Sequence, residues 1–235
     1  MVKVVEPAGQ SLAGVRIFRS LSPAERDGVA RLCQGRRFPA GHELVHDGDR
    51  TDDVYFVVGG KVRATIFALS GKEVSFRDLG PGDVVGDLSA IDSGPRSATV
   101  VAIEESTVLS MSATAFWDVM ESHPSVTAAM LRELTALVRS LSERVVEYST
   151  LGVKNRLHAE LLRLAQAAAP GCDEARISPA PTHAEIASRI ATHREAVTRE
   201  LSHLASSGLL ARMSGGLVVK DVTRLKRMVD EVKGI

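Results

Sequence analysis

The spacing of apolar and polar positions changes its period along the chain. From about residue 37 to residue 112, alternating apolar pieces such as VYFVV (54–58) and SATVVAI (97–103) are separated by glycine-containing turns. Turn signals that recur roughly every 8–12 residues between such pieces are typical of a compact all-β roll, sandwich or barrel. Before this stretch, Ser22, Pro23 and Glu25 occupy the N-cap, first-turn and capping-box positions of a helix. We therefore expect a short helix followed by an all-β domain.

Beyond Ser112 the pattern becomes helical. From residue 125 to residue 148 there is no glycine or proline, and apolar residues recur at intervals of three or four: Met130, Leu134, Leu137, Leu141, Val145 and Tyr148. These intervals are close to the seven-residue repeat of a coiled coil. A helix that packs only on its own domain could carry the same pattern. The near-heptad spacing favours a dimerisation helix over 125–150.

The C-terminal part predicts a third structural region. Helical patterns cover 153–169, 182–191 and 193–210, an apolar hairpin pattern covers 209–221, and a last helical pattern covers 222–234. Three helices and a small hairpin in about 80 residues are the layout of a winged helix-turn-helix. The sequence thus predicts an α+β protein with a β-roll domain and flanking helices over 1–124, the dimerisation helix over 125–150, and a winged helix-turn-helix over 151–235.

The helix pair within 182–204 has a buried side and a polar side. Thr182 and Glu185 form the capping box of the first helix, and a tight turn is expected at 191–192. The second helix has an apolar stripe that we expect to be buried, formed by Val197, Leu201 and Leu204. Four polar residues share one sector away from this stripe: Arg194, Glu195, Thr198 and Arg199.

The polar sector fits the chemistry of base edges in a DNA major groove. Arginine can form a fork to guanine O6 and N7, glutamate can accept from cytosine N4, and threonine can contact a thymine methyl group. A solvated helix face with a Glu195–Arg199 pair would use the same residue types. The capped helix before it and the glycine-rich hairpin after it favour DNA reading. The predicted DNA-binding residues are Thr182, His183, Thr192, Arg194, Glu195, Thr198 and Arg199, with His183 as a phosphate contact.

The stretch GDLSAIDSGPRSATV (86–100) places a carboxylate, Asp87, and a cation, Arg96, among the predicted strands. A guanidinium removed from water loses its hydration and cannot neutralise by losing a proton. An interior Arg96 therefore predicts an anionic partner. The alternative is an ordinary surface turn with a solvated arginine.

Composition and charge narrow the class of protein. The 235 residues are 44% apolar and 25% charged, with no apolar run of membrane-spanning length and no signal peptide pattern, so we expect a cytoplasmic protein without a membrane partner. Net charge is zero, but residues 152–235 hold 13 basic and 9 acidic side chains, which makes this end the basic one. The two cysteines, Cys33 and Cys172, lack metal-site spacing, and no metal, haem or iron–sulfur cluster is expected. Without a nucleophile elbow, HExxH motif or Walker loop, we do not expect an enzyme.

Together these features resemble the CRP/FNR family of bacterial transcription regulators, over the chain from about residue 15, and most closely its cyclic-AMP receptor branch. The family's phosphate-binding cassette is similar to Gly86, Asp87, Leu88 and Ser89 followed by Arg96, Ser97 and Ala98. The resemblance implies that Arg96 and Ser97 bind the phosphate of a cyclic nucleotide, with backbone N–H groups near Ser89 and Ala98. It further implies that Asp87 binds the ribose hydroxyl, Phe76 forms a wall, and Ser142 contacts the purine.

The function implied by the resemblance is a homodimeric regulator of transcription. It would bind cAMP, cGMP or both as its allosteric effector and recognise double-stranded DNA with TGTGA-like half-sites, with RNA polymerase as a partner through the loop at 170–178. The chain departs from the pattern in three ways: Asp87 replaces a glutamate, the run to Arg96 is one residue shorter, and Leu141 replaces a threonine. The nucleotide therefore stays open. A family member with another small effector, or a nucleotide-binding module that regulates a protein partner, are the alternatives.

Overall fold

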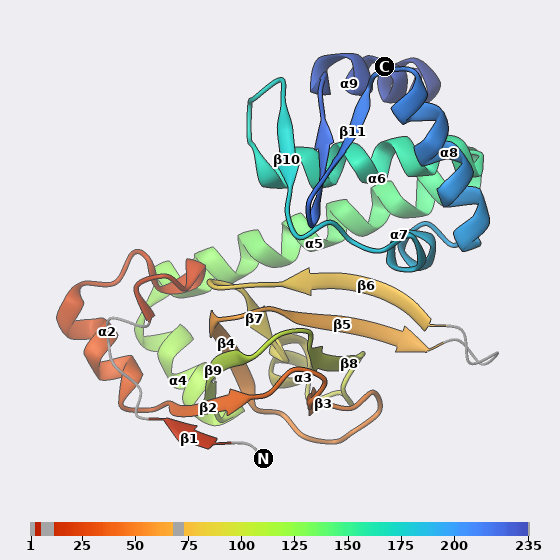
Figure 1. Ribbon diagram of the computed structural model, residues 1–235. Coiled ribbons are helices and arrows are strands. Elements are labelled where there is room, and N and C mark those ends of the chain that lie inside the picture. Colours follow the sequence, from red (N-terminus) through yellow and green to blue (C-terminus); the bar gives the residue numbers. More distant parts are fainter. Residues whose placement is uncertain (1–2, 6–11, 68–72, 235) are drawn as a thin grey trace. The chain divides into compact units, whose positions relative to one another are not determined.

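The computed structural model describes residues 3–5, 12–67 and 73–234 (Figure 1). The chain divides into two compact units, Met1–Val138 and Arg139–Ile235, which meet within one long helix. The predicted division at residues 124 and 150 stays a prediction.

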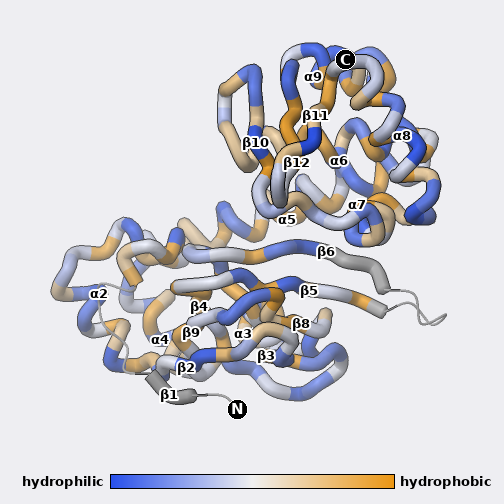
Figure 2. The backbone as a smooth tube through the Cα atoms, viewed as in Figure 1, coloured by the Kyte–Doolittle hydropathy of each residue, from blue (hydrophilic) through white to orange (hydrophobic). Residues whose placement is uncertain are grey.

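The described strands of the first unit form two antiparallel sheets, as predicted for the β-roll. One sheet has the order β1 (Lys3–Val5), β2 (Gln34–Phe38), β9 (Ser106–Met111), β4 (Val54–Gly59), β7 (Val84–Val85). The other has the order β3 (Glu43–Val45), β8 (Thr99–Ala102), β5 (Val62–Phe67), β6 (Glu73–Leu79). Alternate residues of both sheets share one apolar core, which includes Val57, Val62, Val100 and Val108. Figure 2 shows this hydrophobic character clearly at β4.

Helices enclose a second core in the first unit. They are η1 (Arg16–Phe18), α2 (Pro23–Ala30), α3 (Asp87–Asp92), α4 (Ala113–Ser122) and the first part of α5 (Pro124–Thr150). Ser22 and Glu25 form the predicted capping box of α2. Phe56 contacts Phe18 edge-on, with ring centroids 4.9 Å apart, and lies 6.3 Å from Phe116. The helices η1 and α4 are thereby packed against β4.

The predicted apolar seam of α5 is wrong at two positions. Met130 is only 3% exposed and Leu134 packs on the same core, so both belong to the interior of the first unit. A different set, seven residues apart, faces outward: Leu131, Val138 and Val145 are 59%, 61% and 63% exposed. Successive residues on a helix are about 100° apart, so a shift of one position moves the pattern to another face. Val145 is the predicted seam residue that also lies on this exposed stripe.

The second unit is the predicted winged helix-turn-helix. Its elements are α6 (Val153–Ala168), β10 (Ala175–Ile177), α7 (His183–Arg189), α8 (Arg194–Ser206), β11 (Leu210–Met213), β12 (Gly216–Val219) and α9 (Val222–Lys233). The strands form an antiparallel sheet in the order β10, β12, β11. The sequence predicted a loop at 170–178, but 175–177 form β10, because Ala175 and Ile177 are buried against β12 and α6. None of the described helices combines the length and apolarity that crossing a bilayer requires.

Local signals position the helix pair of the second unit. Thr182 and Glu185 form the predicted capping box of α7. The turn between the helices contains Ala191 at φ 51°, a left-handed conformation that few residues other than glycine adopt. The predicted stripe of α8 is buried: Val197, Leu201 and Leu204 lie in the core of the second unit.

Candidate functional site

The turn from β7 into α3 is shaped around the guanidinium of Arg96. Gly86 has a φ of +80°, and a Cβ placed there would lie 2.3 Å from Arg96 Nη1 and 2.7 Å from the carbonyl oxygen of Asp53. Any side chain at residue 86 would therefore displace the arginine or the backbone. Glycine is required here by both the backbone conformation and the close approach.

Arg96 lies in the interior, as predicted, with an exposed fraction of 2%. Its Nε donates to Thr51 Oγ1 at 2.9 Å, its Nη2 to the carbonyl of Asp53 at 2.9 Å, and its Nη1 to the carbonyl of Gly86 at 3.3 Å. The guanidinium carbon lies 5.8 Å from the ring centroid of Tyr55. These acceptors are neutral oxygens, which satisfy hydrogen-bond donors but do not balance the positive charge. A guanidinium in this state can form a charge-assisted contact with an anion that reaches it.

The other predicted cassette residues differ in how far they are exposed to solvent. Ser97 and Leu88 are exposed, Asp87 and Ala98 are half-buried, and Ser89 is buried with its hydroxyl donating to the carbonyl of Pro95 at 3.3 Å. Burial raises the pKa of the Asp87 carboxyl, against the opposing effects of its own backbone N–H and of the Arg77 charge. A desolvated carboxylate of this kind is a strong acceptor for a ligand hydroxyl.

For two predicted ligand residues, the described contacts show no place at this site. Phe76 falls in β6, but its side chain lies outside the described residues. Ser142 is an exposed residue of α5 within the second unit, so its purine contact stays a prediction.

Sequence reasoning missed a charge cluster next to the cassette. The Asp83 carboxylate accepts from Arg16, from Arg77 Nη2 at 3.3 Å and from the backbone N–H of Gly80 at 2.7 Å. Arg16 also donates from Nε to Glu133 of α5 at 2.8 Å. The cluster thus links η1, the β6–β7 turn and α5. Arg16 and Glu133 lie far from Asp83 in the sequence, so local spacing could not have indicated the whole cluster.

The second predicted site is the polar side of α7 and α8. Arg194, Glu195 and Arg199 are exposed on α8, while Thr192 and Thr198 are half-buried. The Thr198 hydroxyl donates to the carbonyl of Arg194 at 3.0 Å, so it accepts from His183 Nδ1 at 2.7 Å. Thr198 therefore orients His183, and its predicted contact with DNA stays a prediction.

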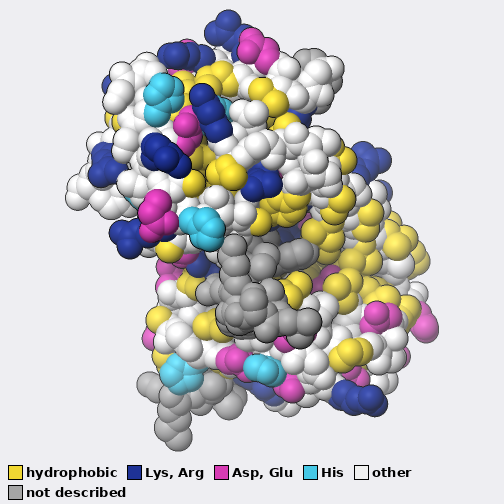
Figure 3. All heavy atoms as spheres, turned by 90° about the vertical axis from the view of Figure 1, so that its right-hand side faces the viewer, with side chains coloured by type: hydrophobic (Ala, Val, Ile, Leu, Met, Phe, Trp, Pro, Cys, Tyr) yellow, Lys and Arg dark blue, Asp and Glu magenta, His cyan; other side chains and the backbone are white. Residues whose placement is uncertain are grey.

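Basic residues surround this polar side. Burial lowers the pKa of His183, and the charges of Arg212 in β11 and of Arg194 lower it further. In Figure 3, Lys, Arg and His side chains are spread over the surface of the second unit, with Asp and Glu among them. This face presents charged groups that suit the phosphates of DNA and hydrogen-bonding groups that suit its base edges.

A buried histidine of α6 contacts α8. His158 of α6 lies 2.8 Å from Glu200 of α8 through Nε2 and Oε1, and Lys154 Nζ lies 4.0 Å from the same oxygen. Burial lowers the pKa of His158 more than the neighbouring Glu200 raises it. This polar contact adds to the apolar packing that holds α8. Sequence reasoning treated His158 and Glu200 only as parts of helical patterns.

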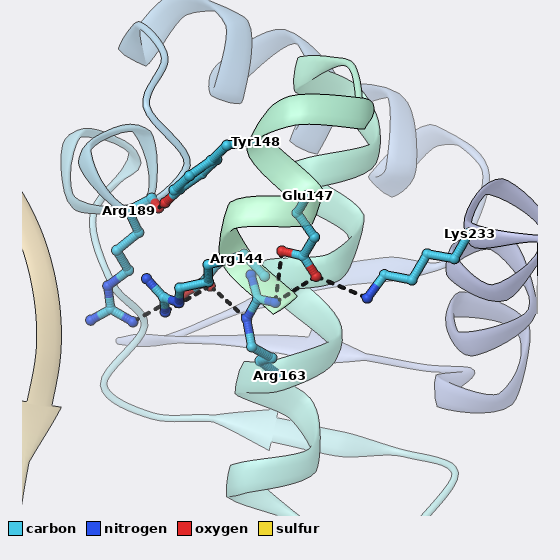
Figure 4. A network of polar contacts seen from close by, with 7 residues as sticks. Arg144, Glu147, Tyr148, Arg163, Arg189 and Lys233 are labelled. Carbon is cyan, nitrogen blue, oxygen red and sulfur yellow. Dashed lines mark hydrogen bonds and ion pairs between the residues drawn. The ribbon is translucent and has the colours of Figure 1, made fainter. Parts of the chain in front are cut away.

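A second polar network fixes the end of α5 within the second unit (Figure 4). Glu147 is 2% exposed, and its carboxylate accepts from Arg163 Nη1 at 2.9 Å and from Lys233 Nζ at 2.9 Å. The Tyr148 hydroxyl donates to the carbonyl of Arg189. Burial alone would raise the pKa of Glu147, but Lys233 and Arg163 outweigh it and lower the pKa. The last turns of α5 are thereby joined to α6, α7 and α9.

Comparison with known proteins shows the same two parts. Residues 35–123 match the family profile of the cyclic nucleotide-binding domain, and residues 155–228 match that of the Crp-like helix-turn-helix domain. The chain is 30% identical over 221 residues to the cyclic AMP receptor protein of Thermus thermophilus, covering 92% of this chain and 98% of that protein. It is 29% identical over 219 residues to a CRP-like cAMP-activated global transcriptional regulator of Mycobacterium tuberculosis, covering 92% of this chain and 97% of that protein.

A solved structure agrees with these matches. The catabolite activator protein of Thermus thermophilus superposes with a TM-score of 0.54 at 28% identity, covering 92% of this chain and 99% of that chain. The match extends over both units, so the combination of the two parts is shared as well as each part.

The buried network at Glu147 predicts a measurable loss of stability. Glu147→Gln leaves Lys233 without this carboxylate and leaves Arg163 with Glu160. The free energy of unfolding should fall by about 3 kcal/mol at pH 7, the low end expected for breaking a buried pair. Because the folded-state pKa of Glu147 is lowered, this stabilisation is complete above the unfolded pKa of about 4.3 and is lost as pH falls through the folded value. Urea unfolding at pH 7 and at about pH 3, below the unfolded pKa, measures both effects.

The matched control is Glu143→Gln, which removes an exposed carboxylate one turn earlier on α5. It should change the free energy of unfolding by less than about 0.5 kcal/mol. Equal effects of the two substitutions would show that the Glu147 network does not stabilise the second unit.

Proposed function

The chain belongs to the CRP/FNR family of transcription regulators, and from this premise we propose that it is a dimer that binds a cyclic nucleotide in its first unit and a TGTGA-type palindrome with its second. It carries a cyclic nucleotide-binding domain and a helix-turn-helix, and it is a DNA-binding regulator rather than an enzyme. The relatives from Mycobacterium and Thermus are named for cAMP, which supports a cyclic nucleotide effector, cAMP or cGMP.

The observation that carries the proposal is the buried Arg96 with its neutral acceptors. In the proposed complex the guanidinium binds the cyclic phosphate, and the exposed hydroxyl of Ser97 donates to the same group. Backbone N–H groups near Ser89 and Ala98 complete the phosphate site. The half-buried Asp87 accepts from the ribose hydroxyl, and Ser142 contacts the purine.

The exposed stripe of α5 supports a homodimer. Leu131, Val138 and Val145 recur every seven residues, which is the spacing of a coiled-coil seam. Large exposed apolar residues in a row are unfavourable in water and are typical of an interface. We assign the outward stripe to a second copy of the chain, while Met130 and Leu134 pack on the first unit.

DNA recognition is assigned to α8 with support from α7. Arg194, Glu195 and Arg199 are exposed and able to reach base edges, whereas Thr182, His183 and Thr192 are assigned to the DNA backbone. In a dimer, two such helices meet successive major-groove faces when they lie about 34 Å apart.

Regulation follows from a difference in affinity. The nucleotide shifts the protein toward the arrangement of dimer helices to which it binds more tightly, and that arrangement spaces the two recognition helices for DNA. RNA polymerase is the proposed protein partner at promoters.

Arg96 is the sharpest test of the ligand site. Arg96→Gln should weaken binding of cAMP and cGMP by at least about 30-fold, because a buried charge-assisted contact is lost. Isothermal titration measures the affinities, and thermal unfolding establishes that the variant is folded. Arg50→Gln, which changes an exposed arginine near Thr51, should bind as the wild type does. Unchanged affinity in folded Arg96→Gln would place the ligand elsewhere.

Arg194 tests DNA recognition. Arg194→Ala should lose about 1–3 kcal/mol of binding free energy at a cognate guanine and should relax base preference at that position. Arg212→Ala, in the wing, should weaken binding to all sequences alike and reduce the salt dependence. Binding assays on a TGTGA-type palindrome and on single-base variants, with the effector present, separate the two outcomes. An Arg194→Ala protein with unchanged base preference would refute this assignment.

Val138 tests the dimer. Val138→Glu places a charge on the exposed stripe of each copy, and like charges in an apolar seam repel and resist desolvation. The variant should sediment as a monomer at concentrations where the wild type is a dimer. Ser140→Glu adds the same charge on another exposed face of α5 and should stay dimeric. A dimeric Val138→Glu protein would exclude this stripe as the interface.

A further inference from the structure

A second arginine lies beside the cassette, on the first unit's strand β6. Arg77 is opposite Ala64 of β5, while the neighbouring pair Arg63 and Asp78 lie opposite each other. Successive residues of a strand point to opposite faces, so Arg77 shares the face of Leu79, which is part of the core between the sheets. Arg77 therefore lies on the core face of β6, the edge strand of its sheet, with its side chain 37% exposed.

Arg77 and Asp87 line the same small cavity. Its volume is about 20 Å³, and its wall also includes Glu133 and Leu137 of α5. Arg96 does not contribute to this wall among the described residues, so the two arginines approach the cassette from different places. The positive charge of Arg77 reaches the Asp87 carboxyl, whose pKa it lowers.

The hydrogen bond that holds Arg77 is one that the protein can give up. Arg77 Nη2 contacts Asp83 at 3.3 Å, at the long end of the hydrogen-bond range. The Asp83 carboxylate also binds Arg16 and the backbone N–H of Gly80, at 2.7 Å for the latter. If Arg77 turns away, Asp83 keeps a cation and a donor. A cavity of this size does not hold a base, so entry of a base requires such a movement.

The order of groups along a cyclic nucleotide places the base near Arg77. With the phosphate at Arg96 and the ribose hydroxyl at Asp87, the base extends beyond the ribose, on the side away from the phosphate. Guanine presents two acceptors, O6 and N7, on one edge, whereas adenine presents the N7 acceptor and the N6 donor. A guanidinium has donors only, so its fork satisfies guanine and meets a donor on adenine.

We propose that Arg77 is a specificity-determining residue of the ligand site and that it selects cGMP over cAMP. The inference rests on the proposed function, because it requires the phosphate at Arg96 and the ribose at Asp87. It assigns to this chain a different preferred nucleotide from the one in the names of its relatives. The observation behind this proposal is that Arg77 and Asp87 line the same cavity.

Isothermal titration of the full-length protein with both nucleotides tests the selection. The wild type should bind cGMP at least about tenfold more tightly than cAMP, within the range of one bidentate contact. Arg77→Gln should abolish or reverse the preference, because cGMP loses the guanidinium fork while a glutamine amide can pair with adenine N6 and N7. The matched control is Arg63→Gln, which removes an arginine on the opposite face of the neighbouring strand and should keep the wild-type ratio.

Two analogues test the same contact without any substitution, in case Arg77→Gln does not fold. Inosine 3′,5′-cyclic monophosphate keeps O6 and N7 but lacks the 2-amino group, and it should bind the wild type within about threefold of cGMP. The 7-deaza analogue of cGMP lacks the N7 acceptor and should bind at least about tenfold more weakly than cGMP.

Each other outcome is decisive. If the wild type binds cAMP as tightly as cGMP, or if folded Arg77→Gln keeps the wild-type ratio, the selection by Arg77 is refuted while the proposed function stands. If the inosine analogue binds as weakly as cAMP, the 2-amino group is read and the fork is excluded. If neither nucleotide binds the wild type, the proposed function fails and the inference fails with it.

Discussion

The burial of one guanidinium constrains the whole ligand side of the first unit. Arg96 cannot discharge itself, so its donors need acceptors at fixed places: the Thr51 hydroxyl and the carbonyls of Asp53 and Gly86. These groups come from two separate segments, and both must hold their backbone conformation for the arginine to stay in the interior. The site for an anion is therefore built before the anion arrives, which reduces the ordering that binding would otherwise require.

Helix α5 is anchored by polar contacts in each unit. In the first, Glu133 accepts from Arg16, which also binds Asp83 in the turn that leads to the cassette. In the second, Glu147 is held by Arg163 and Lys233. Both anchors are short-range and geometrically specific, unlike apolar packing, which tolerates sliding. Residues of α5 are thus held by ion pairs in both units, at Glu133 in the first and at Glu147 in the second.

Features with local causes could be predicted from the sequence, and those with distant causes could not. The capping boxes at Ser22 and Thr182 and the buried stripe of α8 depend on residues within one or two helical turns. The interior position of Arg96 followed from its resemblance to a cassette, but Thr51 and Asp53, its partners some 45 positions earlier, had no signal of their own. The predicted seam of α5 included Met130 and Leu134, which pack on the first unit instead, because periodicity shows that a helix has an apolar face but not which neighbour covers it.

The two apolar faces of α5 also limit how its length can vary. Each inserted residue would rotate everything after it by about 100° and advance it by 1.5 Å. A single insertion between Leu134 and Val145 would leave Leu131 in place but turn Val145 and the Glu147 network to a new angle about the helix axis. Seven inserted residues would nearly restore that angle. Natural length variation in this helix should therefore come in steps of seven residues. The loops of the β-roll are not under this restriction.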